Sequence, residues 1–242
     1  MGNRKELTSN SIKIIAIIAM TIDHITWRFF PGFQIASLPL SLHLIGRITA
    51  PIMMFFIVEG YYHTKNIKKY IFRMFLFSVI SHIPFAIFVG INIIPLKDGI
   101  FEQTSVIWGF LMGLISLSVY KSTNMLFKPW LKGLIIILCI ILAIPANWSA
   151  PTVFAVLFMG INYGNFKKQM LWLVLSVFIY SIVYLLIIDT IYGILQMGIV
   201  LAIPFLACYK GKRGTWKGMK WLFYIFYPLH LLILGLIRIF IL

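Results

Sequence analysis

Charged side chains, and acidic ones above all, are scarce in this sequence. Only 11% of its 242 residues are charged, and 6 acidic residues stand against 21 basic ones. An ordinary soluble domain has about 25% charged and about 45–50% apolar residues, whereas 61% of this chain is hydrophobic. The composition therefore excludes an ordinary soluble domain and indicates that lipid surrounds most of the chain.

The chain also lacks a cysteine framework, a low-complexity linker and an internal repeat. Cys139 and Cys208 lie alone in apolar segments without ligand spacing, so we expect packing roles for both and no metal site. Because nothing divides the chain, residues 1–242 are predicted to form a single transmembrane domain. The first apolar segment contains Asp23 and has no small-residue cleavage site, so we expect it to remain as an anchor.

Long apolar runs are abundant. A hydrocarbon core of about 30 Å needs about 20 apolar residues in a helix, and segments of about that length recur along the chain. We therefore predict an all-α, polytopic membrane protein with about nine transmembrane helices, the sixth of which is short. They lie near residues 10–30, 40–61, 69–92, 105–122, 130–147, 150–164, 169–187, 190–209 and 219–241.

The basic residues fall in short loops on alternate sides of these segments. With a cytoplasmic amino terminus, nearly all of the 21 Lys and Arg, including Arg4 and Lys5, lie on the inner side. Only Arg28, Lys97 and Arg238 then lie outside. This asymmetry predicts a cytoplasmic amino terminus and an extracytoplasmic carboxyl terminus. The basic excess thus reflects topology and contact with anionic lipid, and we expect no nucleic-acid partner.

Several ionisable residues lie inside the predicted spans, where each costs a few kcal/mol and needs a partner. A rise of about 1.5 Å per residue puts His24 roughly 20 Å from the inner face and Arg47 roughly 9 Å below the outer face, which is the same level. The same reasoning puts His82 and His230 near mid-membrane. We therefore expect these four side chains to cluster between the midplane and the outer third of the bilayer.

Asp23 is adjacent to His24 in the sequence. Neighbouring helical residues point about 100° apart, so Asp23 cannot face His24 directly, whereas it can pair with Arg47 on the next helix. We predict a structural Asp23–Arg47 pair beside a reactive His24. The alternative is an ion pair that docks two helices without any chemistry. His43, at the outer edge, is predicted to be interfacial.

Basic residues also gather at the predicted inner face. Lys13 precedes His24 by eleven residues on one face of the first helix, roughly 16 Å away, which is comparable to a pantetheine arm. The inner loop near 210–218 contains glycines between closely spaced cations, a composition that suits a phosphate group or an ordinary positive-inside turn. The cations of this loop are Lys210, Lys212, Arg213 and Lys217.

Four motifs occur in order along almost the whole chain: SIKIIAIIAMTIDH, GRITAPIMMFFIVEGYYHTKN, SHIPF, and GKRG followed by KWLFYIFYPLHLL. Together they resemble the TraX family, whose named member acetylates the amino-terminal amine of conjugative pilin. The first helix also resembles the arginine, ten residues, histidine pattern of the acyltransferase-3 family. Lys13 stands in place of that arginine, and His24 matches the histidine. A lysine keeps the cation but loses the bidentate grip.

The resemblance implies transfer of an acetyl group from cytoplasmic acetyl-CoA to an amine or hydroxyl outside the bacterial cytoplasmic membrane. The acceptor would be a pilin-like amino terminus or a cell-envelope glycan. Lys13 and the inner loop would hold the nucleotide, and His24 would receive the acceptor's proton or the acetyl group itself. Asp23 would pair with Arg47, and a nearby donor would stabilise the oxyanion. Candidates for that donor are Arg47, His230 and Tyr227. The predicted substrate pocket comprises His82, Glu59, His63 and Tyr227.

Two other classes of protein remain open. A small transporter or lipid scramblase would also cluster charges in the membrane, but it favours inverted repeats or paired broken helices, which we do not find. A non-catalytic membrane scaffold would need no polar cluster. The sequence leaves open the acceptor, the choice between N- and O-acetylation, an acetyl-histidine intermediate and the oligomeric state.

Overall fold

The computed structural model describes residues 6–124 and 128–240, except for the side chain of Lys220. The topology argument from Arg4 and Lys5 lies outside the described residues. Within the described ranges the regular structure is helical, and the only extended pairs are two isolated bridges, Leu7–Tyr209 and Thr104–Ala146. The predicted all-α fold is therefore confirmed.

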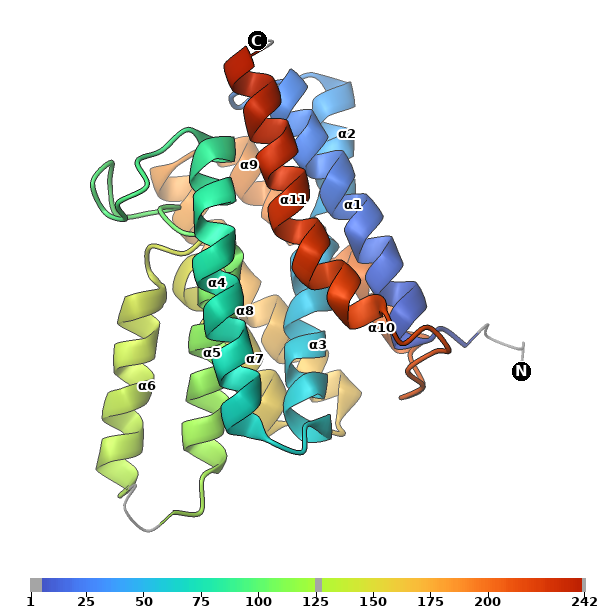
Figure 1. Ribbon diagram of the computed structural model, residues 1–242, viewed down its shortest axis with the longest axis vertical. Helices are drawn as coiled ribbons and strands as arrows, with labels where there is room; N and C mark the ends of the chain where they lie inside the picture. Colours follow the sequence, from blue (N-terminus) through green and yellow to red (C-terminus); the bar gives the residue numbers. More distant parts are fainter. Residues whose placement is uncertain (1–5, 125–127, 241–242) are drawn as a thin grey trace. The chain divides into compact units, whose positions relative to one another are not determined.

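The helices lie close to the segments that the sequence predicts (Figure 1). The loop predicted near residues 210–218 also lies before the last helix. The helices are α1 (Ser9–Phe29), α2 (Ser37–Gly46), α3 (Thr49–His63), α4 (Ile67–Val89), α5 (Val106–Lys121), α6 (Pro129–Ala143), α7 (Ser149–Ile161), α8 (Phe166–Ile187), α9 (Thr190–Leu195), the 3₁₀ helix η1 (Gln196–Ala202), α10 (Ile203–Ala207) and α11 (Met219–Phe240).

Five helical runs in the described part of the chain are long and apolar enough to cross a membrane. They are Ser37–His63, Ile67–Val89, Phe166–Ile187, Thr190–Ala207 and Trp221–Phe240. Helices α5, α6 and α7 are apolar but shorter, with 16, 15 and 13 residues. A stripe along α6, from Trp130 to Leu142, is largely exposed and apolar, as expected of a surface in contact with lipid tails.

By packing, the chain divides into two compact units. Unit 1 comprises Met1–Met53 and Val177–His230, and unit 2 comprises Met54–Ser176 and Leu231–Leu242. Helices α3, α8 and α11 each contribute residues to both units. The division concerns packing within each unit, so the single domain over residues 1–242 stays a prediction.

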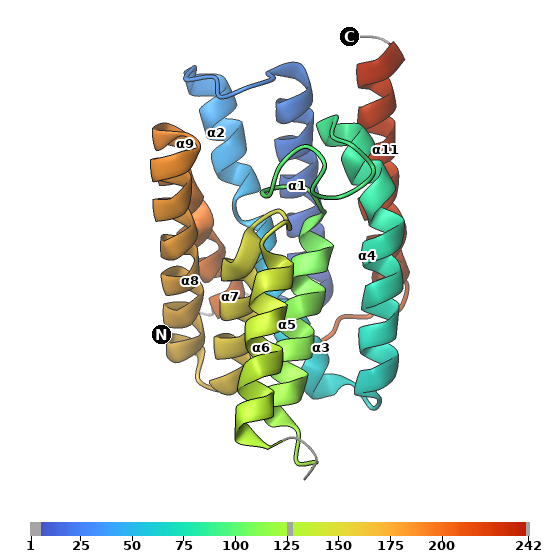
Figure 2. The same ribbon diagram turned by 90° about the vertical axis from the view of Figure 1, so that its left-hand side faces the viewer.

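Unit 2 is built around the contact of α5 with α7, beside which α6 lies (Figure 2). Glycines bring the two helices together. A Cβ atom on Gly113 would lie 2.8 Å from Cβ of Val156, and one on Gly160 would lie 2.4 Å from the methyl carbons of Leu117. Helices in lipid gain little from hydrophobic burial, so small residues that permit close backbone contact stabilise such pairs.

In unit 1, the second predicted helix is divided into α2 and α3, with Arg47 and Ile48 between them. Pro51 is the cause, because it has no N–H to donate to the carbonyl of Arg47. The span predicted over residues 40–61 is thus interrupted at these two residues, although Ser37–His63 remains one run long enough to cross a membrane. The break leaves Arg47 at the carboxyl end of α2.

Helix α2 also lies against α1, and Gly46 permits the contact. A Cβ atom at this position would come within 2.3 Å of Cβ of Asp23 and 2.6 Å of its Oδ1. On the other side of α2, a Cβ atom on Gly198 would lie 2.5 Å from Leu44 and 3.3 Å from Cβ of Arg47. Two glycines therefore set how closely α1 and η1 approach the segment that carries Arg47.

We expect Gly46→Ala to destabilise the protein, because the added methyl group overlaps Asp23 and overpacking typically costs about 1–3 kcal/mol. The matched control is Gly133→Ala on α6, where an added Cβ meets nothing within 4 Å. There the helix should gain about 0.5–1 kcal/mol. Thermal unfolding in detergent measures both variants. Equal midpoints for the two variants would contradict the close contact of α1 with α2.

Candidate active site

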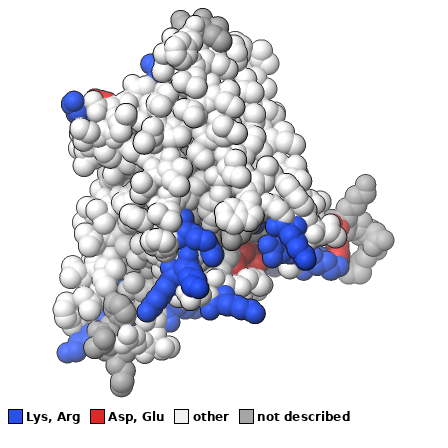
Figure 3. Space-filling view, viewed as in Figure 1, with Lys and Arg blue, Asp and Glu red and all other residues white. Residues whose placement is uncertain are grey.

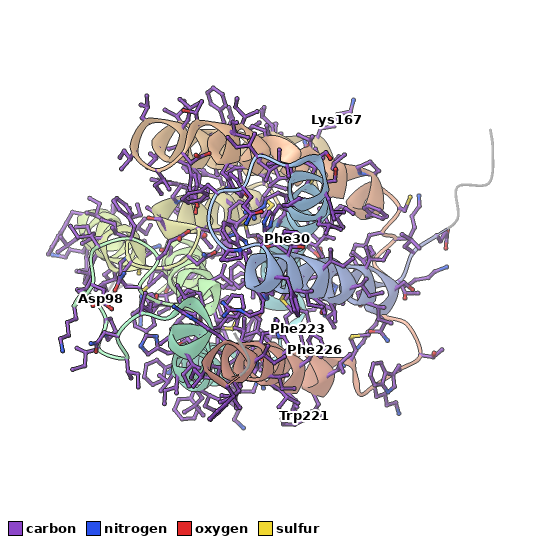
Figure 4. The ribbon with its side chains drawn as sticks, turned by 90° about the horizontal axis from the view of Figure 1, so that it is seen from above. Phe30, Asp98, Lys167, Trp221, Phe223 and Phe226 are labelled. Carbon is purple, nitrogen blue, oxygen red and sulfur yellow. The ribbon has the colours of Figure 1, made fainter. Side chains whose placement is uncertain are left out.

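Two histidines, His24 on α1 and His230 on α11, lie in contact, and both residues belong to unit 1. Nδ1 of His24 lies 2.7 Å from Nε2 of His230, and the rings are stacked with centroids 5.0 Å apart. Phe226 stacks on the His230 ring. Figure 4 shows Phe223 and Phe226 on the side of α11 that faces α1, whereas Trp221 points away. The histidine pair is thus lined by apolar rings of α11.

The hydrogen bonds of this pair fix the positions of its protons. Nδ1 of His230 lies 2.8 Å from the carbonyl oxygen of Phe226. A carbonyl oxygen only accepts, so Nδ1 of His230 donates, and Nε2 of a neutral His230 is then an acceptor. His24 must therefore donate from Nδ1, and its lone pair lies on Nε2. The tautomer of His24 follows from its hydrogen-bond partners, and it is the one that a base or nucleophile at Nε2 requires.

A second polar network surrounds Asp23. Nδ1 of His43 lies 2.7 Å from Oδ1 of Asp23, and the guanidinium of Arg47 lies 3.3 Å from the same oxygen. Arg47 also donates to the side chain of Gln196 on η1 at 2.9 Å and to the carbonyl of His43 at 3.3 Å. Asp23 pairs with Arg47, as predicted. Because its three nitrogens have these contacts, Arg47 acts as a structural cation that joins α1, α2 and η1.

His43 lies in the interior of unit 1, so its predicted interfacial position is wrong. The residue is 0% exposed, and its ring lies 4.5 Å from that of Trp27 and 5.5 Å from that of Tyr192, centroid to centroid. It is one helical turn before Arg47, on the same face of α2. That spacing was the signal in the sequence that could have placed His43 beside Asp23. Nothing in the sequence pointed to Gln196.

At the start of α1 a group of hydrogen bonds, here called the clasp, joins residues 7–10 to the loop 208–216. The N–H groups of Ser9 and Asn10 donate to the carbonyls of Lys212 and Arg213, at 2.9 and 3.2 Å. The Asn10 side chain donates to the carbonyl of Trp216 at 2.9 Å. These carbonyls accept hydrogen bonds from the first turn of α1, so its backbone N–H groups are not available to bind an anion.

The loop keeps its cations on the outside of the clasp. Lys210, Lys212, Arg213 and Lys217 are all exposed. Figure 3 shows basic side chains on the lower right of the drawn face, with an acidic side chain beside them. Lys212 lies 2.7 Å from Glu6, and this hydrogen bond and charge lower the pKa of the Glu6 carboxyl. Any phosphate bound here would therefore meet side-chain cations.

The other predicted site residues are divided between the units. Lys13 lies partly buried on α1, and Tyr227 lies 4% exposed with its ring against His230, so both belong to unit 1. Glu59, His63 and His82 belong to unit 2. His63 donates from Nδ1 to the carbonyl of Glu59, and Nε2 of His82 lies 2.7 Å from the carbonyl of Ile93. Their place in one substrate pocket stays a prediction.

Apolar helices with a histidine pair and an ion pair between them define a multi-pass membrane protein with a polar site in its interior. The model of the TraX protein family matches residues 8–238. The chain therefore belongs to the TraX family. It is 28% identical over 249 residues to the "Probable fimbrial assembly protein FimC, serogroup H1" of Dichelobacter nodosus, covering 97% of both chains. No solved structure matches it significantly.

The Asp23–Arg47 pair should be essential for stability. We expect Arg47→Met to cost about 3–5 kcal/mol, because it leaves the Asp23 carboxylate without its cation. Asp23→Asn in the same chain should restore part of the loss, since the charge is then gone. Unfolding in detergent measures both. The exposed Glu6–Lys212 pair provides the control, and Glu6→Gln should leave the midpoint unchanged. Additive losses for Asp23→Asn and Arg47→Met would show that the two residues are not coupled.

Proposed function

We propose that this protein is a membrane-embedded acetyltransferase that moves an acetyl group from cytoplasmic acetyl-CoA to an amine or hydroxyl at the outer face. The observation that carries the proposal is the hydrogen-bonded chain from the Phe226 carbonyl through His230 to His24. It holds a histidine inside the protein with its lone pair on Nε2. Membership of the TraX family and the resemblance of the first helix to the acyltransferase-3 pattern support the same chemistry.

The topology that we propose has nine spans, with the amino terminus in the cytoplasm. Its support is the agreement between the helices and the nine predicted segments, together with the positive-inside asymmetry. Helices α5, α6 and α7 are roughly 20–24 Å long at 1.5 Å per residue, which is short of a full hydrocarbon core. Residues of α5 and α7 are buried against each other, so these two need not match the lipid along their whole length.

In this reaction Nε2 of His24 attacks the thioester carbonyl carbon. A bond forms between Nε2 and the acetyl carbon, the carbon–sulfur bond breaks, and the CoA thiolate leaves toward the cytoplasm. The acetylated ring is then cationic and still carries a proton on Nδ1. Its hydrogen bond to His230 becomes charge-assisted in this step, and an interaction that strengthens as the reaction proceeds accelerates it.

The donor would enter from the inner side of unit 1. His24 follows Asn10 at the same interval at which His230 follows Trp216, so α1 and α11 leave the clasp together and meet again at the histidines. Figure 1 shows α1 in blue beside the first turns of α11, which belong to the same unit. Along α1 this interval corresponds to a rise of roughly 20 Å, close to the reach of a pantetheine arm. The loop cations and Lys13 would hold the nucleotide phosphates.

We infer a pilin-like acceptor. The similar protein of Dichelobacter nodosus is named as a fimbrial assembly protein, and the TraX family is associated with pilin. Both connect this chain to conjugation or pilus assembly. An amino-terminal amine presented at the outer face of the membrane is the acceptor that fits both.

The first test is binding and turnover of radiolabelled acetyl-CoA by protein purified in detergent. Wild type should bind saturably and release CoA, whereas His24→Ala should bind but release none, because the attacking nitrogen is gone. Ile25→Ala is the control, since Ile25 is the next residue, points about 100° away from His24 and is 41% exposed. Full CoA release by a folded His24→Ala variant would refute the role of His24. No binding by wild type would favour the transporter class.

The four cations of the loop near 210–218 should set the affinity of the protein for acetyl-CoA. We expect Gln at Lys210, Lys212, Arg213 or Lys217 to raise the Kd of acetyl-CoA about threefold to tenfold each, with CoA release at saturation unchanged. The effect should shrink at high salt, because exposed charges are screened. Lys167→Gln with Lys168→Gln, two exposed cations at the start of α8, is the control. Equal effects of loop and control substitutions would mean that only the overall charge matters.

A further inference from the structure

His43 has one ring nitrogen that the network around Asp23 does not use. Nδ1 donates to Asp23, whereas Nε2 is buried and has no hydrogen-bond partner among the described residues. Leaving a buried polar atom unsatisfied costs about 1–3 kcal/mol. A contact that only docks His43 on Asp23 needs Nδ1 alone. The buried, unsatisfied Nε2 therefore points to a further role for this nitrogen.

The pairing with Asp23 gives that nitrogen a defined chemistry. The carboxylate accepts from Nδ1, so a neutral His43 carries its lone pair on Nε2, and the negative charge stabilises the imidazolium that forms when Nε2 takes a proton. A carboxylate that orients a histidine in this way is the arrangement of general bases in acyl transfer. Arg47 and Gln196 hold the carboxylate in place from the other side.

The aromatic side chains around Nε2 of His43 limit which molecules can reach this nitrogen. The rings of Trp27 and Tyr192 lie against His43, and Phe33 lies edge-on to Trp27 with centroids 5.9 Å apart. The hydroxyl of Tyr192 donates to the carbonyl of Gln34 at 3.2 Å. Trp27 is only partly buried, and Phe33 is 42% exposed. A molecule that enters past these rings and carries an N–H or O–H group would satisfy the nitrogen.

We propose that His43, oriented by Asp23, is the general base that takes the acceptor's proton, and that Trp27 and Tyr192 form the wall of the acceptor subsite. The inference rests on the acetyltransferase function proposed above. The acceptor amine attacks the acetyl carbon on His24, the bond from that carbon to Nε2 of His24 breaks, and the ring regains its lone pair. The proton lost by the amine goes to Nε2 of His43. Two histidines thus serve two half-reactions.

The test separates those half-reactions with His43→Asn. An asparagine amide can still donate to Asp23 but offers no basic nitrogen. Protein is loaded with radiolabelled acetyl-CoA, freed of excess label, and then discharged with phenylalaninamide, a primary amine with an aromatic side chain. His43→Asn should load like wild type, but its discharge rate constant for phenylalaninamide should fall about 100-fold. Ser41→Ala, an exposed site on the same helix, should discharge like wild type.

Hydroxylamine supplies the second readout. It is a strong neutral nucleophile that needs no base, so it should strip the label from wild type and His43→Asn at the same rate. Equal discharge of both by phenylalaninamide, or no discharge of wild type by it, would overturn the role of His43. So would failure of folded His43→Asn to load. Failure of wild type to load would instead refute the acetyl-His24 step of the proposed function.

Discussion

A carboxylate inside a membrane protein is tolerated only when its charge and its hydrogen-bonding capacity are met, and Asp23 imposes that constraint on unit 1. The partners come from two other helical segments: His43 and Arg47 from α2 and its carboxyl end, and Gln196, which supports Arg47, from η1. Removing charged groups from water costs several kcal/mol each, so the pair persists only with this geometry. The packing of α2 and η1 around α1 therefore follows from one buried charge.

The backbone adapts to that constraint at two places. Pro51 divides α2 from α3 and leaves Arg47 at a helix end, from which its side chain reaches Asp23 and Gln196. Across from it, the run over residues 190–207 changes to 3₁₀ geometry in η1, before Pro204. Irregular backbone at membrane depth is tolerated where protein surrounds it. Both irregular segments lie where the polar network needs side chains from more than one helix.

Depth was the part of the site that the sequence could predict. Rise per residue put His24 and Arg47 at one level and His230 near mid-membrane, and unit 1 brings His24 to His230 and Arg47 to Asp23. Pairing was harder, because a count along one helix says nothing about how neighbouring helices are turned. His43 was therefore misjudged as interfacial, although it lies one turn from Arg47. The helices themselves were predictable, since the apolar runs are long, whereas the interruption at Arg47 was not anticipated in the segment 40–61.

The two polar groups of unit 1 differ in what they can do, although adjacent residues of α1 anchor them. His24 belongs to a hydrogen-bonded chain that fixes its tautomer without a formal charge, and in the proposed reaction its Nε2 would be the nucleophile that becomes cationic only on reaction. His43 is paired with a carboxylate, which orients its ring and leaves Nε2 as the lone-pair nitrogen of the neutral imidazole. A charge-free histidine suits acyl transfer, and a carboxylate-paired one suits proton transfer. Because Asp23 and His24 are neighbours on one helix, a shift of α1 would move both groups together and would couple the two proposed half-reactions to a single helix.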